Sequence, residues 1–250
     1  MFKRIVLTAL LVASSGASKA ALVEWYPTFD TTGTSDVVTL GETVEAFNFS
    51  SDGTLYEEPR SQDTEINGIT FLESTDTFDL DAGERSFLET DVTGATSGDL
   101  NYDTLLDTLD YGGGKDSVSF YAGDGYLVEG NTYLVQFWYA DIREDLTGSR
   151  IMRVGDGYAS DALLHNYGEG LGQYIIGTFV ADSDSQYFEF QVETNFGNAH
   201  LNAYQLRDVT GESTFNLAEG RNLAEVPAPL VPSLACFILM LIRRGERSLA

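Results

Sequence analysis

The composition and charge of this 250-residue chain limit what it does. It has 39 Asp and Glu against 14 Lys and Arg, and residues 21–225 alone hold 38 acidic and 8 basic side chains, a net charge of −30. This charge repels nucleic acids and anionic membranes and so argues against a nucleic-acid partner, while a hydrophobic content of 43% is that of a folded domain and not of a disordered chain.

The first twenty residues predict a secretory signal peptide. "MFKR" is positively charged, "IVLTALLVA" is apolar, and "SKA" supplies the small residues that precede a cleavage site, here after Ala20. The only cysteine is Cys236, near the C-terminus, so the domain that follows the signal has no internal disulfide. We expect an exported domain that is stabilised by its hydrophobic core.

Residues 21–210 predict a single all-β domain. Short alternating or apolar runs recur between Gly, Asp, Asn and Ser clusters, which is typical of a β-sandwich. The runs are 43–49, 66–72, 117–121, 132–140, 149–154, 173–181, 186–194 and 199–207. Run 186–194 alternates, whereas run 132–140 is apolar on both faces and predicts a central strand.

One segment has helical spacing instead. Tyr102, Leu105, Leu106 and Leu109 share one helical face, with Asp99 or Asn101 as the N-cap and Gly112 as the stop. We expect a short helix across one end of the sandwich.

The stretch "LVEGNTYLVQFWYADIR" resembles the G-x-x-Y-x-V-x-F strand of galactose-binding-like jelly-roll domains. The resemblance covers one strand and its preceding turn, and it implies a jelly-roll-like β-sandwich.

The C-terminal region divides into two parts. Residues 211–225 lack periodicity and predict a linker, and residues 226–250 contain an apolar stretch followed by Arg243 and Arg244. The stretch is near the lower length limit for a membrane-spanning helix. The arginines would stay on the cytoplasmic side and leave the acidic domain outside the inner membrane.

This tail, on a chain with a signal peptide, resembles the PEP-CTERM sorting signal of Gram-negative bacteria. Val226, Pro227, Ala228 and Pro229 stand where the family has V-P-E-P, so Ala228 replaces the usual Glu, and the two arginines stand for the basic end. The resemblance implies recognition by an exosortase-type sorting enzyme, a transient inner-membrane anchor, and delivery to the cell surface or extracellular matrix. Either cleavage or retention of the tail is compatible with the sequence.

Motifs for catalysis are not evident. The two histidines, His165 and His200, have no metal-ligand spacing, "DYGGGKD" does not match a P-loop, and no G-x-S-x-G elbow occurs. Carboxylate pairs are too numerous for sequence to identify a glycosidase pair. We therefore predict no enzyme.

The segment "WYADIREDLTGSRIMRVGDGY" gathers arginines that are scarce elsewhere. One interpretation is a salt-bridged hairpin. The other is a polar ligand-binding rim, in which aromatic side chains stack on sugars. The rim would consist of Asp141, Arg143, Arg150, Asp156, Tyr158 and Tyr167.

Acidic loops suggest a structural calcium ion. "GDGYASD" provides Asp156 and Asp161, and "DSDS" provides Asp182 and Asp184, all hard oxygen ligands. Neither loop matches an EF-hand, so solvated acidic turns are the alternative.

Together these features predict an exported, non-catalytic module that binds polysaccharide or matrix proteins. The alternatives are a secreted carbohydrate-active enzyme on a jelly-roll fold and a purely structural matrix protein.

Overall fold

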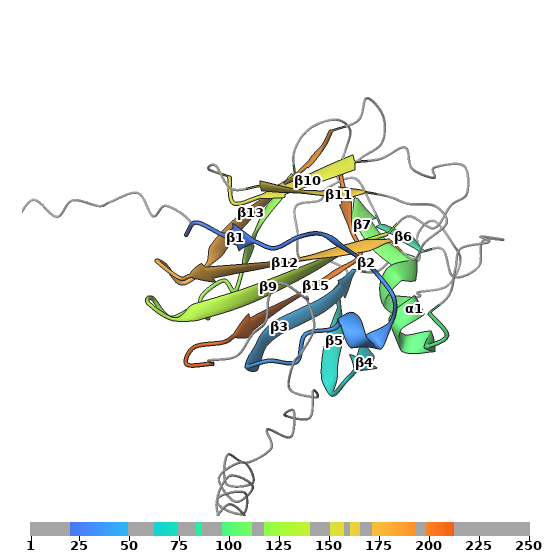
Figure 1. Ribbon diagram of the computed structural model, residues 1–250, viewed down its shortest axis with the longest axis horizontal. Helices are drawn as coiled ribbons and strands as arrows, with labels where there is room; N and C mark the ends of the chain where they lie inside the picture. The colour runs from blue at the N-terminus through green and yellow to red at the C-terminus, as the bar shows by residue number, and fades with distance from the viewer. Residues whose placement is uncertain are drawn as a thin grey trace, which may run out of the picture.

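The protein folds as an all-β sandwich with one short helix, shown by a computed structural model in Figure 1. The structure describes residues 21–49, 63–74, 84–86, 97–111, 118–140, 151–157, 161–165, 172–193 and 199–212. The predicted signal peptide, most of the linker and the predicted sorting tail lie outside these ranges. Within them, no helix is long and apolar enough to cross a membrane.

The larger sheet has eight strands in the order β1-β12-β9-β15-β3-β5-β4, with β2 also paired to β12. Its pairings are antiparallel except for β3 with β5. Its strands are β1 (Glu24–Trp25), β2 (Phe29–Asp30), β3 (Glu42–Phe49), β4 (Thr64–Ile66), β5 (Ile69–Ser74), β9 (Thr132–Tyr139), β12 (Gln173–Val180) and β15 (Ala203–Asp208).

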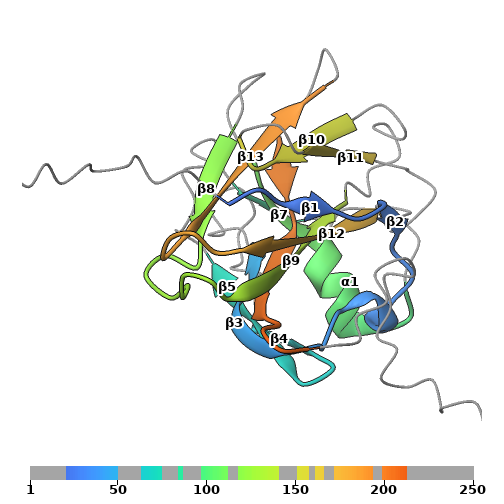
Figure 2. The ribbon, with the colours of Figure 1, turned by 60° about the vertical axis from the view of Figure 1, so that its left-hand side comes forward.

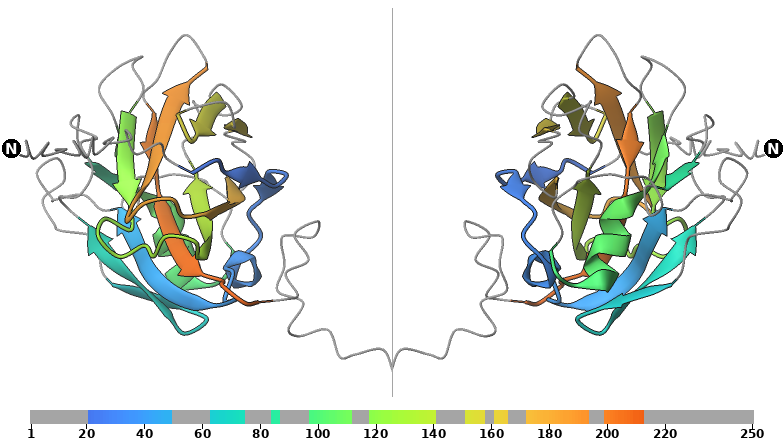
Figure 3. Two further views of the ribbon diagram at one scale, coloured as in Figure 1. Left: turned by 90° about the vertical axis from the view of Figure 1, so that its left-hand side faces the viewer. Right: turned by 90° about the vertical axis from the view of Figure 1, so that its right-hand side faces the viewer.

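The smaller sheet has four antiparallel strands in the order β11-β10-β13-β8. Its strands are β8 (Val118–Ala122), β10 (Ile151–Gly155), β11 (Asp161–His165) and β13 (Gln186–Val192). A third sheet, in the order β14-β7-β6, consists of β6 (Glu84–Ser86), β7 (Thr108–Tyr111) and β14 (His200–Leu201). In both views of Figure 3, β8 and β13 lie above β3 and β5.

The chain passes repeatedly from one sheet to the other. It runs from β8 in the smaller sheet to β9 in the larger, back to β10, again to β12, back to β13, and then to β15 of the larger sheet. This crossing pattern, with sequence neighbours in opposite layers, agrees with the predicted jelly-roll-like sandwich.

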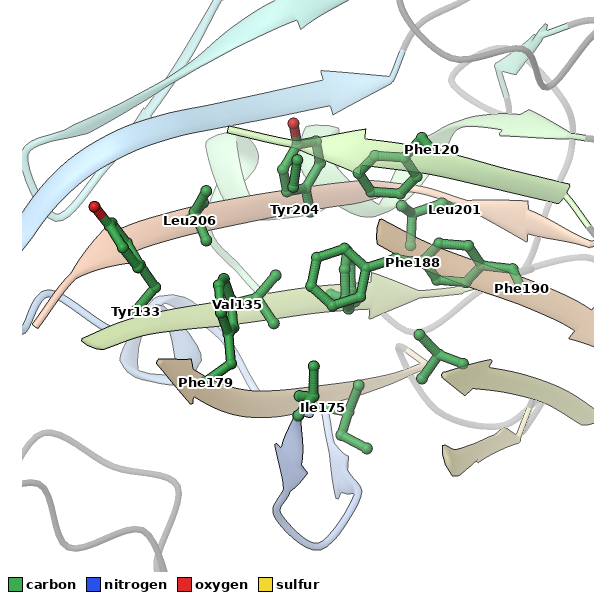
Figure 4. Packing of buried hydrophobic residues seen from close by; sticks show 14 of the residues in the cluster. Phe120, Tyr133, Val135, Ile175, Phe179, Phe188, Phe190, Leu201, Tyr204 and Leu206 are labelled. Carbon is green, nitrogen blue, oxygen red and sulfur yellow. The ribbon is translucent and has the colours of Figure 1, made fainter. Parts of the chain in front are cut away.

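The main core lies between the two sheets (Figure 4). Phe137 of β9 is fully buried and contacts Phe188 and Phe190 of β13 edge-on, with ring centroids 5.0 and 5.2 Å apart. Phe120 of β8 stacks on Phe190 at 5.7 Å. Alternating residues of facing strands therefore supply this core, as the sequence pattern predicts.

A second core covers the outer face of the larger sheet. Leu134, Trp138 and Ile176 point to this side, where Trp138 meets Phe71 of β5 edge-on at 5.6 Å. The covering elements are the β4–β5 hairpin at one end of the same sheet, Val37 and Val38 directly after a 3₁₀ turn η1 (Thr34–Asp36), and the helix α1 (Leu100–Asp107). The prediction that β9 is a central strand, apolar on both faces, is confirmed.

The helix begins where the sequence predicts and ends earlier. The Asp99 carboxylate accepts hydrogen bonds from the backbone N–H groups of Asn101 and Tyr102, so Asp99 is the N-cap. The helix stops at Asp107, and Leu109 lies in β7. Because Tyr102 and its apolar neighbours insert into the second core, α1 lies against the outer face of the larger sheet and not across one end of the sandwich (Figure 2).

Two predicted strands are interrupted. The run 66–72 contains a tight turn, because Asn67 and Gly68 both have positive φ (54° and 78°), the geometry of a two-residue hairpin that Asn-Gly favours. The run 199–207 divides at Asn202, whose buried amide donates to the carbonyls of Leu106 and Thr108 and accepts from the N–H of Ala140. Asn202 thereby links the end of α1 to the end of β9.

Candidate functional site

The outer face of the smaller sheet combines exposed aromatic and charged side chains. Along β13, Phe188 and Phe190 point into the core, so Tyr187, Glu189 and Gln191 point outward. The neighbouring strands complete the face with Ser119, Tyr121, Arg153, Asp161 and Leu163, and Glu193 follows the end of β13. We call this set of residues the outer surface.

Two tyrosines form the aromatic part of the outer surface. Tyr121 of β8 and Tyr187 of β13 are directly opposite each other in the strand register, and their ring centroids are 5.3 Å apart with planes inclined by 62°. The Tyr121 side chain is 61% exposed. Tyr187 is partly exposed. An aromatic pair of this kind on a rigid sheet offers apolar ring surface and phenol hydroxyls to a ligand at little conformational cost.

A glycine positions one of these rings. Gly157 follows β10 with φ +77°, and a Cβ built there would lie only 2.6 Å from Cε1 of Tyr187. A side chain at this position is disfavoured twice, by the left-handed backbone and by the ring. The turn after β10 therefore packs directly against the edge of the tyrosine pair.

Charged groups lie on the same face, around Arg153. Its guanidinium is 2.6 Å from carboxylate oxygens of both Asp161 and Glu193, so one cation joins β10, β11 and the end of β13. The bond to Glu193 and the charge of Asp161 raise the pKa of Arg153 above its usual value. The pairs are about half exposed, so each contributes only about 0–1 kcal/mol to stability.

Of the six residues predicted to form the ligand-binding rim, the structure describes only Asp156. Asp141, Arg143, Arg150, Tyr158 and Tyr167 lie outside the described residues. The predicted salt-bridged hairpin would join the strand that ends at Tyr139 to the next strand, but these two strands, β9 and β10, lie in different sheets. Arg153 of β10 pairs instead with Asp161 of β11.

Asp156 does not lie on an exposed rim. Its side chain is fully buried, and its Oδ2 accepts a hydrogen bond of 3.0 Å from the backbone N–H of Val23. We therefore assign Asp156 to the anchoring of the N-terminal segment and not to a ligand-binding rim.

The four aspartates predicted as calcium ligands have different surroundings. Asp156 is buried, Asp161 is paired with Arg153, and Asp182 and Asp184 are exposed in the turn between β12 and β13. In the part of the chain that the structure describes, no three His, Cys, Asp or Glu side chains form a group that could hold a metal ion.

His200 is a structural residue. It is 2% exposed, its ring stacks on Tyr139 with centroids 4.3 Å apart, and its Nε2 lies 3.1 Å from the carbonyl oxygen of Ala140. The side chain of His165 is outside the described set.

Tyr121 and Tyr187 were not predicted as site residues from the sequence. The available signal was alternation: both precede or follow core phenylalanines in their strands and so had to point outward. Their proximity depends on the pairing of β8 with β13, which connect through β9, β10, β11 and β12 and which no local pattern specifies.

Comparison with known proteins identifies no family. No protein-family model matches the chain, and no curated protein matches it either. Solved structures that resemble it include a calcium-binding mutant of β-glucuronidase 2 from Bacteroides uniformis, with 16% identity, a TM-score of 0.40 and coverage of 66% of this chain and 18% of that one. The extracellular domains of ANXUR2 and ANXUR1 from Arabidopsis thaliana have 10% and 9% identity and TM-scores of 0.44 and 0.32.

These matches cover 66% of this chain and 48% and 47% of the two plant proteins, so the chain spans less than half the length of each solved structure named. At such identities and TM-scores the likeness carries no argument about activity, and the fold assignment rests on the strands and sheets described above.

Proposed function

We propose that this protein is an exported, non-catalytic polysaccharide-binding module whose outer surface contacts the glycan. The observation that carries the proposal is the pair formed by the exposed Tyr121 and the partly exposed Tyr187 on a largely polar sheet face. Tyrosine rings stack on the apolar faces of sugar rings, and the surrounding carboxylates, amide and guanidinium exchange hydrogen bonds with sugar hydroxyls.

The charge of the surface narrows the class of glycan. Asp161, Glu189 and Glu193 outnumber Arg153, and the whole chain has a net charge of −25. Polysaccharides rich in uronic acid or sulfate are repelled by such a field, whereas neutral or amino-sugar polymers are not. We therefore assign the surface to neutral or cationic glycans.

Export and sorting supply the biological setting of the proposal. The signal-peptide pattern supports export, and the tail that resembles PEP-CTERM supports handling by an exosortase-type enzyme followed by surface or matrix delivery. Mass spectrometry of the protein from envelope and medium tests this part. A C-terminus between Val226 and Pro229 supports sorting-enzyme cleavage, and an intact tail found only in membranes contradicts surface release.

The glycan surface is tested by affinity electrophoresis and calorimetry with neutral, amino-sugar and uronic-acid polysaccharides. We expect binding to one of the first two classes, and a loss of about tenfold or more in affinity for Tyr121→Ala and Tyr187→Ala. Tyr126→Ala is the matched control, because Tyr126 is 73% exposed but lies in the turn between β8 and β9 and is not part of either strand. Equal loss in all three variants contradicts the proposal.

Calcium is part of the proposal as a structural ion at the turn that contains Asp182 and Asp184, because Asp156 is buried against Val23 and Asp161 pairs with Arg153. Repeating each titration and each thermal melt with calcium and with a chelator measures its contribution. A structural ion predicts a higher Tm in calcium, by the mass-action stabilisation of the native state. Ordered self-assembly without any glycan affinity supports a purely structural matrix protein instead.

A further inference from the structure

The segment Ala21–Trp25 joins the two sheets. On one side β1 pairs with β12 of the larger sheet, in the register Glu24 to Thr178 and Trp25 to Gly177. On the other side, Val23 and Ala21 bind side chains of the smaller sheet. In Figures 1 and 2, the trace of β1 runs between β12 and the β10–β11 hairpin. This segment therefore closes one side of the sandwich.

The contact with Ala21 uses both of its backbone groups. The Ala21 N–H donates to Oε1 of Gln186 at 3.0 Å, and the Ala21 carbonyl accepts from Nε2 of the same amide at 2.9 Å. Ala21 is 7% exposed and Gln186 is 1% exposed. The buried side-chain amide of Gln186 thus binds both the backbone N–H and the backbone carbonyl of Ala21, and the two hydrogen bonds fix the position of Ala21.

Close packing holds the rest of the segment. Trp25 contacts Phe137 and Phe188 of the main core, with centroids 6.2 and 6.1 Å apart. A Cβ at Gly177 would lie 2.6 Å from a methyl group of Val23, so only glycine admits the segment at this depth.

Ala21 is also the residue that signal-peptide cleavage would expose. Hydrolysis breaks the bond between the carbonyl carbon of Ala20 and the nitrogen of Ala21. Water supplies the hydroxyl of the new Ala20 carboxyl group and a proton to the nitrogen, which takes a further proton from solvent and becomes an ammonium. One neutral N–H donor is thereby replaced by a positive charge with three donors.

We propose that Gln186 and Asp156 form a binding site for the α-ammonium of the processed chain, so that cleavage after Ala20 locks the N-terminal segment across both sheets. The proposal rests on the export included in the proposed function. Gln186 Oε1 is already placed to accept from the nitrogen, and the buried Asp156 carboxylate, bonded to Val23 N–H, supplies the opposite charge.

The distance between the ammonium and the Asp156 carboxylate is short enough for the two charges to attract each other. Two residues of extended chain separate the nitrogens of Ala21 and Val23 by about 7 Å, so the carboxylate oxygen 3.0 Å from Val23 N lies within about 10 Å of the ammonium. In a buried site this attraction is screened far less than at the surface.

The test inserts one glycine between Ala20 and Ala21 in the full-length gene. The insertion keeps the cleavage sequence "SKA" and moves the ammonium one residue away from Ala21, while the Ala21 N–H remains as an amide. Mass spectrometry of the exported proteins establishes their first residues. Denaturant unfolding then compares both forms, alone and with Asp156→Asn, and with Asp124→Asn as the control that removes an exposed carboxylate.

We expect the insertion to lower the folding equilibrium constant about tenfold in the native and Asp124→Asn backgrounds, and by less than about twofold with Asp156→Asn. An equal decrease in all backgrounds overturns the ammonium site. In a measurement that needs no substitution at Asp156, the α-amine of the native protein should be acetylated at least about tenfold more slowly than that of the inserted protein, and equal rates overturn the proposal.

The two proposals fail separately. A first residue other than Ala21 overturns the ammonium site and the predicted cleavage position, but it leaves the glycan surface intact. A protein that begins at Ala21 and shows equal acetylation rates overturns the ammonium site alone.

Discussion

The outer faces of the two sheets differ in how they meet solvent. On the larger sheet, Trp138 and Ile176 lie under α1, η1 and the β4–β5 hairpin, and the face is completely buried at these positions. On the smaller sheet, Tyr121 and Asp161 are exposed, and charged side chains share the face with the tyrosines. One face is a second core, and the other is available to a ligand.

The difference follows from the side chains that each strand turns outward. Leaving one apolar face of a strand exposed to water destabilises the folded state. Because β9 is apolar on both faces, it requires a third layer over the outer face of its sheet. β13 turns Tyr187, Glu189 and Gln191 outward, and these side chains are satisfied in water. We therefore expect ligand binding on the outer face of the smaller sheet, whose polar side chains can hydrogen-bond to water and which stays exposed.

Trp138→Ala gives the strongest test of this difference. We expect a loss of about 3–5 kcal/mol in the free energy of unfolding, because the substitution leaves a cavity beneath Phe71 and Tyr102 and removes the bond from Trp138 Nε1 to the Tyr102 hydroxyl. Denaturant titration measures it. The partner measurement is Tyr121→Ala on the bare face, where the loss should remain within about 0.5 kcal/mol. Comparable losses would show that the smaller sheet also has a covered face.

Asp107→Asn tests the covering helix through pH. Burial, and secondarily the charge of Asp103, raises the pKa of Asp107 from 3.8 to about 7. Between about pH 4 and pH 7 the Asp107 carboxyl therefore keeps its proton in the folded state but loses it in the unfolded state. The contribution of Asp107 to the free energy of unfolding consequently declines as the pH rises from about 4 to 7. At about 1.4 kcal/mol per unit, the penalty above pH 7 is at most about 4 kcal/mol.

We expect Asp107→Asn to be more stable than the native protein at pH 7.5 and equal to it below pH 4. Thermal melts of both proteins across this range provide the comparison, and the difference between them isolates Asp107 from the other carboxylates. A difference that does not change with pH would contradict the raised pKa.

Gly157→Ala should disturb the bare face locally. The new Cβ meets the Tyr187 ring and takes a positive φ, so we expect a loss of about 1–2 kcal/mol in stability and a weaker glycan affinity. Gly125→Ala is the matched control, since it shares the positive φ (+78°) but has open space around its Cβ. Should both variants bind glycan equally well, the position of Tyr187 would not matter for binding.

The smallest expected effect concerns Arg153. Because its ion pairs with Asp161 and Glu193 are partly exposed and reached by solvent, Arg153→Gln should change stability by less than about 1 kcal/mol, and the change should shrink in high salt. Unfolding titrations at low and high ionic strength measure it. A larger, salt-independent loss in the free energy of unfolding would mean that the Arg153 ion pairs are buried structural contacts and are not available to a ligand.

Local patterns predicted much of the secondary structure for physical reasons. The double-faced run 132–140 and the alternating run 186–194 became β9 and β13, and Asp99 caps α1 because its carboxylate reaches the free N–H groups of the first turn. The Asn67-Gly68 turn was missed although its signal was present, since these two residues tolerate the positive φ that a two-residue hairpin needs.

The candidate site was less predictable. The rim proposed from arginines and aspartates included Asp156, which the structure buries beneath Val23, and it omitted Tyr121 and Tyr187. An acidic residue next to glycines is typical of a solvated loop. Nothing in the sequence near Asp156 indicates that the N-terminal segment packs over this side chain.

The sequence by itself determined that this protein is a β-rich, acidic domain with strands whose periodicity assigns each side chain to a face, because that periodicity is a property of the extended backbone. Only the tertiary structure decided which faces meet. It brought Tyr121 beside Tyr187, covered Trp138 with α1, and placed Gln186 and Asp156 at the backbone of Ala21 and Val23. These are contacts between residues far apart in the chain, and they are set by how the sheets cross and pack, which no local pattern encodes.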